Sequence, residues 1–189
     1  MRVIGTVGLP GSGKGELAEV AQEAGIPVVT MGDIIREECR NRGLDPATDH
    51  GKIAKALREE EGDDAIAARS LPVIEDYLES NDVVVVDGLR SGVELDRFTE
   101  AFGDDFVLVS VEAPFELRAD RLGDRGRDDS DTDVESLKKR EERELDFGMG
   151  EAMDRADVVI ENTGTLEAYH EKITLLFEDG PEAVAEVTE

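Results

Sequence analysis

The sequence predicts a doubly wound α/β domain built on a five-stranded parallel sheet. Short runs rich in β-branched residues alternate along the chain with longer stretches of helical periodicity. The short runs are continuously apolar, which is typical of strands buried on both faces of a parallel sheet. Alternation of strands and helices places the helices on the two faces of such a sheet. The length of 189 residues fits a single domain.

Five apolar runs are the expected strands, at residues 3–7, 27–30, 83–86, 106–111 and 158–160. The amphipathic stretches between and after them are the expected helices, at residues 14–24, 32–42, 50–60, 65–79, 94–102, 114–123, 133–145 and 166–177.

Two regions contain more helices than a simple alternation of strands and helices requires. Two or three helices lie within residues 32–80, and a charged segment with a further helix lies within residues 118–145. Both regions follow strands, at the edge where open α/β sheets bind ligands. We expect one domain over residues 1–178. Residues 179–189 are acidic and contain Gly and Pro, so a frayed tail is expected there.

The amino-acid composition limits the classes of partner that the protein is expected to bind. The chain carries 47 acidic and 21 basic side chains, a net charge of −26. Such a surface repels nucleic acid and anionic lipid, so neither is an expected partner. Dense carboxylates also suit a salt-rich, halophilic cytoplasm, where salt screens their repulsion. The single cysteine, Cys39, fits a reducing interior, and no apolar run approaches a membrane span or a signal peptide. A cytoplasmic location is therefore expected.

The strongest motif is Gly8-Leu9-Pro10-Gly11-Ser12-Gly13-Lys14, between the first expected strand and the first expected helix. Strand, glycine-rich loop and helix in this order form the context of a phosphate-binding P-loop. The glycines let N–H groups point at phosphate oxygens, and the helix dipole adds to them. Lys14 supplies a full charge to the β and γ phosphates. The motif predicts ATP binding by residues 8–16; the alternative is a glycine-rich turn without a ligand.

The position after the lysine departs from the general P-loop pattern. That pattern places Ser or Thr there as a ligand of Mg²⁺, whereas this chain has Gly15 followed by Glu16. A carboxylate at position 16 could reach Mg²⁺ directly or through water. The alternative is that Glu16 is an acidic residue that favours a helix N-terminus.

Gly15 resembles the glycine of adenylate kinases and related nucleoside monophosphate kinases, whose loop reads G-x-P-G-x-G-K-G-T. The segment Thr30-Met31-Gly32-Asp33-Ile34-Ile35-Arg36 is similar to their S/T-T/S-G-D-x-L-R. The resemblance implies that Gly32 and Arg36 bind the acceptor, and that Asp33 lies near Mg²⁺ or the attacking oxygen. It also makes residues 32–80 an acceptor-binding region and residues 118–145 a short lid. The alternative is that Asp33 caps a helix and Arg36 lies on its solvated face.

The third expected strand ends in Asp87-Gly88-Leu89-Arg90. P-loop proteins hold Mg²⁺ with a carboxylate at the end of a buried strand, so Asp87 is a predicted metal-binding and catalytic residue. The segment resembles the D-G-F-P-R of the same kinases but lacks the proline. The resemblance implies that Arg90 is a second acceptor-side arginine.

Arginines concentrate in one stretch of this acidic chain, at Arg118, Arg121, Arg125 and Arg127, and Arg140 and Arg143 follow on the next expected helix. In the same kinases a lid carries arginines that close over ATP. This implies that Arg121 binds ATP and that Arg125 and Arg127 are catalytic. The alternative is a salt-bridged helix face. The region is too short for a separate lid domain or a zinc site.

Residues 156–166 resemble the A-D-x-V-I-x-N-x-G-x-L of dephospho-CoA kinases. The resemblance implies that Thr163 and Gly164 pass the adenine ring, although a turn and a capped helix explain the spacing equally well. The whole pattern, over residues 3–177, is most similar to an archaeal family of dephospho-CoA-kinase-like nucleotide-binding proteins.

The expected function is transfer of the γ-phosphoryl group of ATP, with Mg²⁺, to a nucleotide or a nucleotide-like metabolite. The alternative is a nucleotide-dependent ATPase or switch without a small acceptor. A guanine-specific GTPase is disfavoured because no N/T-K-x-D motif follows an expected strand.

Overall fold

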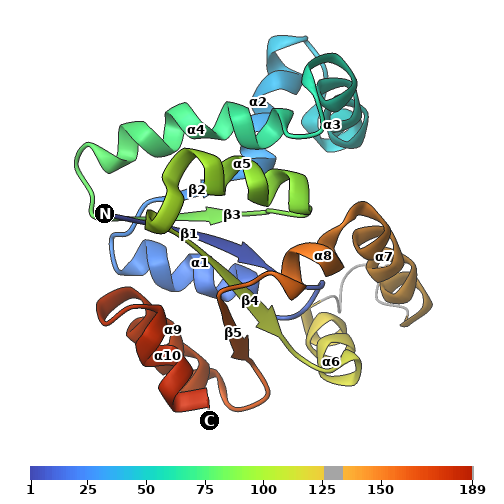
Figure 1. Ribbon diagram of the computed structural model, residues 1–189. Coiled ribbons are helices and arrows are strands. Elements are labelled where there is room, and N and C mark those ends of the chain that lie inside the picture. Colours follow the sequence, from blue (N-terminus) through green and yellow to red (C-terminus); the bar gives the residue numbers. More distant parts are fainter. Residues whose placement is uncertain (126–133, 189) are drawn as a thin grey trace.

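The computed structural model describes residues 1–125 and 134–188. One sheet runs in the order β2-β3-β1-β4-β5, and every neighbouring pair of strands is parallel (Figure 1). Its strands are β1 (Arg2–Val7), β2 (Val28–Thr30), β3 (Val83–Asp87), β4 (Phe106–Glu112) and β5 (Val158–Glu161). The predicted α/β fold with five parallel strands is confirmed.

Helices cover both faces of the sheet, as continuous apolar strands require. Val84 faces a core layer with Phe98, whereas its neighbour Val85 faces a second layer with Leu17 and Ile173. Figure 1 shows α4 and α5 on one face and α1, α9 and α10 on the other. The helices are α1 (Lys14–Glu23), α2 (Met31–Asn41), α3 (Pro46–Glu61), α4 (Ala65–Leu78), α5 (Gly92–Phe102), α6 (Phe115–Arg125), α7 (Val134–Phe147), α8 (Met149–Asp154), α9 (Leu166–Glu178) and α10 (Pro181–Thr188).

The expectation of a frayed tail at residues 179–189 is wrong. Pro181 begins α10, a position that proline favours because its ring presets the helical φ. The helix packs against α9 and β5, and Val184 is fully buried in the core. Helix α8 was also missed, because six residues are too few to show a helical period.

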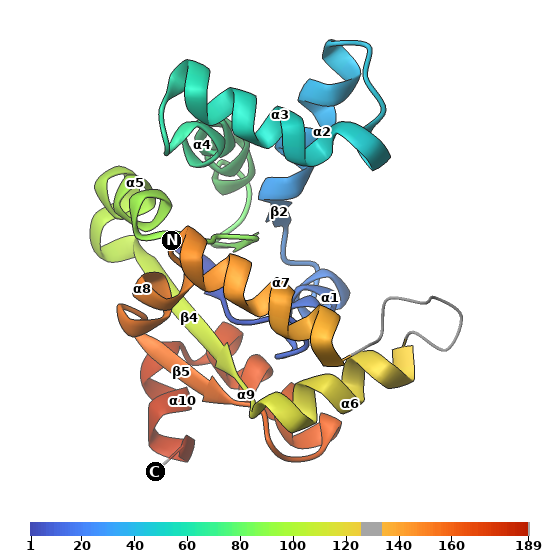
Figure 2. The same ribbon diagram turned by 90° about the vertical axis from the view of Figure 1, so that its right-hand side faces the viewer.

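Helices from the two regions with additional helices, residues 32–80 and 118–145, lie at the carboxyl edge of the sheet. Figure 2 faces this edge and shows α7 crossing in front of the strands, with α2 and α3 on one side and α6 on the other. Within the described residues, no helix has both the length and the apolar character that crossing a bilayer would require.

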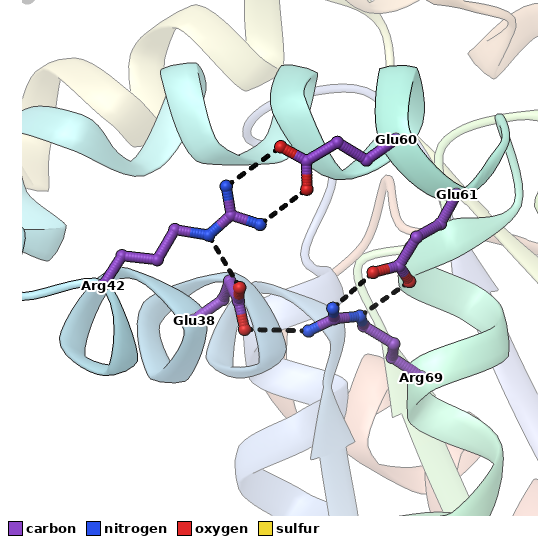
Figure 3. A network of polar contacts seen from close by, with 5 residues as sticks. All are labelled: Glu38, Arg42, Glu60, Glu61 and Arg69. Atoms are coloured by element: carbon purple, nitrogen blue, oxygen red, sulfur yellow. Dashed lines mark hydrogen bonds and ion pairs between the residues drawn. The ribbon is translucent and has the colours of Figure 1, made fainter.

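A network of ion pairs ties α2, α3 and α4 together (Figure 3). Arg42 contacts Glu38 at 2.7 Å and binds both oxygens of Glu60 at 3.1 and 2.7 Å. Arg69 contacts Glu38 at 2.9 Å and holds Glu61 with two hydrogen bonds. Glu38 therefore joins both arginines, and these bidentate pairs fix the helices that precede β3.

Replacing Glu38 with Gln should lower the melting temperature by about 2–4 °C at pH 7 and low salt. Hydrogen bonds from Arg42 and Arg69 hold the pKa of Glu38 below its usual range. Its stabilising effect is therefore present above the pKa of an unfolded glutamate and is lost as the pH falls through the lower folded pKa. Thermal unfolding by circular dichroism, repeated from pH 7 to pH 3, should show the difference closing in acid. Glu37→Gln, at an exposed neighbour, is the control; equal effects of the two variants would contradict the assignment.

Candidate active site

The loop between β1 and α1 has three positions whose backbone conformation favours glycine. Gly11 and Gly13 have φ angles of 81° and 117°, which side chains rarely adopt. A Cβ at Gly11 would lie 2.8 Å from the carbonyl oxygen of Arg118, and one at Gly13 would lie 2.5 Å from Nδ2 of Asn162. Gly8 is equally restricted by the carbonyl oxygen of Val111. The loop is therefore both turned and tightly enclosed.

Side chains from distant parts of the chain hold the carbonyl groups of this loop. Arg118 donates to the carbonyl oxygen of Pro10 at 3.1 Å. Asn162 and Arg121 donate to that of Ser12, at 2.8 and 3.4 Å. The hydroxyl of Tyr169 donates to that of Gly13 at 3.0 Å.

These contacts decide where the amide groups point. In a trans peptide the N–H lies opposite the carbonyl group. The amides of residues 11, 13 and 14 consequently point away from the holding side chains. Helix α1 begins directly after Gly13, and a glycine at the N-cap has no side chain to accept from the first helical amides. The arrangement fits a phosphate chain.

Lys14 completes the loop with a positive charge. Its ammonium group contacts the carbonyl oxygen of Gly8. Burial lowers its pKa to about 8, against the opposing effect of the nearby carboxylates of Asp87 and Glu144. A buried ammonium group with incomplete compensation favours an anionic ligand.

Asp87 ends β3 beside Thr6 of β1, whose hydroxyl donates to its carboxylate at 3.0 Å. Within the described residues, no group of three or more His, Cys, Asp or Glu side chains could hold a metal ion. A single carboxylate near bound phosphates fits Mg²⁺, which usually keeps several waters and phosphate oxygens as ligands. Asp87 is therefore the residue that would hold it.

Glu16, the other predicted metal ligand, has a partner on a distant helix. Its carboxylate contacts Nε2 of His170 on α9 at 2.7 Å. This contact favours the alternative, an acidic residue in the first turn of α1, over a metal ligand. At Gly15 a Cβ would meet open space, so packing does not demand a glycine there.

A cavity of about 650 Å³ lies at the carboxyl ends of β2 and β3. The predicted residues Gly32, Arg36, Asp87 and Arg90 line it. Asp33 does not: its side chain is exposed and forms an ion pair with Arg36 at 2.6 Å. The structure thus brings together the predicted acceptor arginines and Asp87, and leaves Asp33 outside the cavity lining.

Other charged residues in this lining were not predicted as site residues. They are His50, Lys55, Arg58, Glu94, Arg140, Arg143 and Glu144. Arg90 approaches Glu144 of α7 at 3.5 Å. Burial raises the pKa of Glu94, and burial together with the surrounding arginines lowers that of His50. These residues belong to no motif in the sequence; only the local excess of arginine near Arg140 hinted at them.

The predicted lid arginines have different roles. Arg118 is 3% exposed and holds the loop, Ala113 and Glu141, so it is a structural residue of the site. Arg121 contacts both Ser12 and Asn162. The side chain of Arg125 and all of Arg127 lie outside the described residues.

Thr163 and Gly164 form an exposed turn between β5 and α9, and their contact with adenine stays a prediction. Asn162 and Tyr169 are site residues that sequence reasoning missed. Asn162 lies inside the dephospho-CoA-kinase-like motif, which could have drawn attention to it.

Comparisons with known proteins show the family and the fold of the chain. Residues 7–138 match a family model described as an AAA domain. A UPF0200 protein of Halobacterium salinarum is 60% identical over 182 residues, covering 96% of this chain and 95% of that protein. A UPF0200/UPF0201 protein of Archaeoglobus fulgidus is 51% identical over 174 residues, covering 92% of this chain and 54% of that longer protein.

Among solved structures, TT1252 from Thermus thermophilus has a TM-score of 0.63 at 21% identity, covering 94% of this chain and 97% of that one. A gluconokinase from Sinorhizobium meliloti 1021 has 0.53 at 17% (98% and 93% covered), and shikimate kinase from Acinetobacter baumannii in complex with shikimate has 0.51 at 19% (95% and 94%). At these identities the likeness shows the fold alone, which this chain shares with the gluconokinase and the shikimate kinase. The chain belongs to the AAA domain family matched by residues 7–138 and to the UPF0200 family.

Proposed function

We propose that this protein transfers the γ-phosphoryl group of ATP to an anionic, nucleotide-like small molecule bound in the cavity beside Asp87. The observation that carries the proposal is that Arg118, Asn162 and Tyr169 donate hydrogen bonds to the carbonyl groups of residues 10, 12 and 13. The amides of the same peptide units therefore point away from these side chains and are free to face a phosphate chain. The fold of small-molecule kinases supports it, and so does a cationic cavity at the edge of the sheet where such folds bind ligands.

Each side chain has a role in the proposed reaction. The loop amides and Lys14 bind the β and γ phosphates, and Asp87 would hold the Mg²⁺ that neutralises part of their charge. Arg36 and Arg90 bind and orient the acceptor. The acceptor oxygen forms a bond to the γ-phosphorus as the bond to the β–γ bridging oxygen breaks, and ADP leaves. Catalysis then consists of positioning and charge neutralisation.

The charge of the chain determines the conditions of the assay. The relative from Halobacterium salinarum shares 60% of its residues, and the net charge of −26 fits a salt-rich cytoplasm. Labelled ATP and a panel of phosphorylated metabolites should therefore be screened in molar KCl. Transfer of label to one metabolite supports the kinase.

The second candidate function is a nucleotide switch without an acceptor. The observation that favours it is the loss of the usual metal-binding hydroxyl, since position 15 is glycine and Glu16 contacts His170. Calorimetric titration of the metabolite panel in the presence of a non-hydrolysable ATP analogue separates the two functions. Saturable binding of one metabolite supports a kinase, whereas binding of none supports a switch.

Replacing Lys14 with Ala should abolish turnover and weaken ATP binding by about a hundredfold, because a full charge on the phosphates is lost. The pKa of about 8 adds a pH signature. Lys14 is charged below this pH, so ATP affinity of the native chain should fall between pH 7 and pH 9. Calorimetry in the variant should show no such fall. Lys52→Ala, at an exposed lysine on α3, is the control. Unchanged ATP affinity in a folded Lys14 variant would remove the loop from the site.

Replacing Asn162 with Ala should weaken ATP binding about tenfold, because the Ser12 carbonyl loses its strongest contact and the loop its fixed orientation. Calorimetric titration with ATP measures the effect. Asn81→Ala removes an amide that donates to the carbonyl group of Tyr77 in α4, far along the chain from the loop, and it should leave ATP affinity unchanged. If both variants bound ATP as the native chain does, the holding contacts would not organise the loop.

Replacing Arg36 with Ala should raise the KM for the acceptor about tenfold or more and change the KM for ATP little, because Arg36 lines the cavity and not the loop. Steady-state kinetics with the metabolite found by the screen give both constants. Arg40→Ala, an exposed arginine on the same helix, serves as the control. Equal changes in the two constants would exclude Arg36 from the acceptor site.

A further inference from the structure

Arg58 of α3 lines the cavity but belongs to none of the motifs. Its side chain is 17% exposed, and its guanidinium lies 4.5 Å above the ring of Phe147 at the end of α7. Its two terminal nitrogens make long contacts of 3.4 Å, one to the Ala54 carbonyl and one to Glu94. Within the described residues its Nε is buried without a partner. A guanidinium has five donors, so Arg58 can donate to a further acceptor.

Glu94 of α5 is the carboxylate that contacts this arginine. It is 1% exposed, and it accepts the backbone N–H of Arg90 at 2.9 Å as well as Nη2 of Arg58. A buried carboxylate costs stability unless its partners compensate it, and a well-packed apolar residue often serves stability better. Here one contact is long, so stability alone does not account for the carboxylate. What the carboxylate does is hold Arg58 and the turn after β3 in the wall of one cavity.

The cations of the cavity converge from separate elements. Arg36 of α2, Arg58 of α3 and Arg90 after β3 all lie close enough to His50 to lower its pKa. All four side chains line the same cavity. An anion bound there would therefore meet donors on more than one side.

We propose that Arg58 is an anion-binding group of this cavity and that Glu94 is the positioning residue that holds it in place. The ligand is a phosphate or carboxylate group. The inference rests on the proposed function only in identifying this group as part of the acceptor, which would then carry an anionic group within reach of α3. Glu94 touches no reacting atom; it acts through Arg58 and the backbone of Arg90.

The test uses inorganic phosphate as the probe and the full chain with its loop filled by a non-hydrolysable ATP analogue. The side-chain Nε–Hε resonance of Arg58, assigned by its loss in Arg58→Met, should shift and saturate as phosphate is added. Glu94→Gln keeps the shape and should weaken this phosphate binding about tenfold or more. Glu100→Gln, an exposed glutamate on the same helix, should change nothing. No response of the Arg58 resonance, or equal affinity in Glu94→Gln, overturns the proposal.

A double-mutant cycle separates positioning from general damage. On the Arg58→Met background, Glu94→Gln should cause no further loss of phosphate affinity, measured by calorimetry. An additive loss would show that Glu94 acts elsewhere, which contradicts the proposal. Thermal unfolding should find Glu94→Gln at least as stable as the native chain near pH 7, because burial raises the pKa of Glu94 and its charged form costs stability there. If phosphate binds at Arg58 but the ATP analogue does not bind in the loop, the proposed function is overturned and this inference still stands.

Discussion

The orientation of the peptide units between Gly8 and Lys14 is the constraint on which the site depends. Two of the carbonyl groups are held by side chains from beyond residue 160, Asn162 after β5 and Tyr169 on α9. A loop at the start of the chain is therefore organised by its end. The pairing of β5 with β4 positions this contact, because Asn162 follows β5 directly and its backbone N–H donates to the carbonyl group of Glu112.

Electrostatics divides the molecule into an acidic exterior and a cationic cavity. Among the described residues, six lysine and arginine side chains line the cavity, against three carboxylates, in a chain with a net charge of −26. Several of the remaining arginines are paired with glutamates between helices, as in the network around Glu38. Because screening by salt weakens exposed pairs more than partly buried ones, the cavity keeps its field where the surface loses much of its own.

The parts of this structure that could be predicted from sequence are those whose cause is local. The strands showed as apolar runs, and the loop showed because its glycines and Lys14 are consecutive. Asn162, Glu94 and Arg58 could not be assigned, because each acts on a residue that is distant in sequence. The prediction that Glu16 binds a metal stays a prediction. Its contact with His170 could not be foreseen, because the two residues are 154 positions apart in the sequence. The tail was misjudged from its acidic composition, whereas Val184 is buried in the core and fixes α10 there.

Helix α7 connects the two halves of the proposed reaction. The region that contains it was expected to close over ATP, and Arg140, Arg143 and Phe147 of α7 line the cavity beside Asp87. From the same helix, Glu144 approaches Arg90 and raises the pKa of Lys14. It therefore supplies negative charge between the loop and the acceptor arginines, where a phosphoryl group would pass.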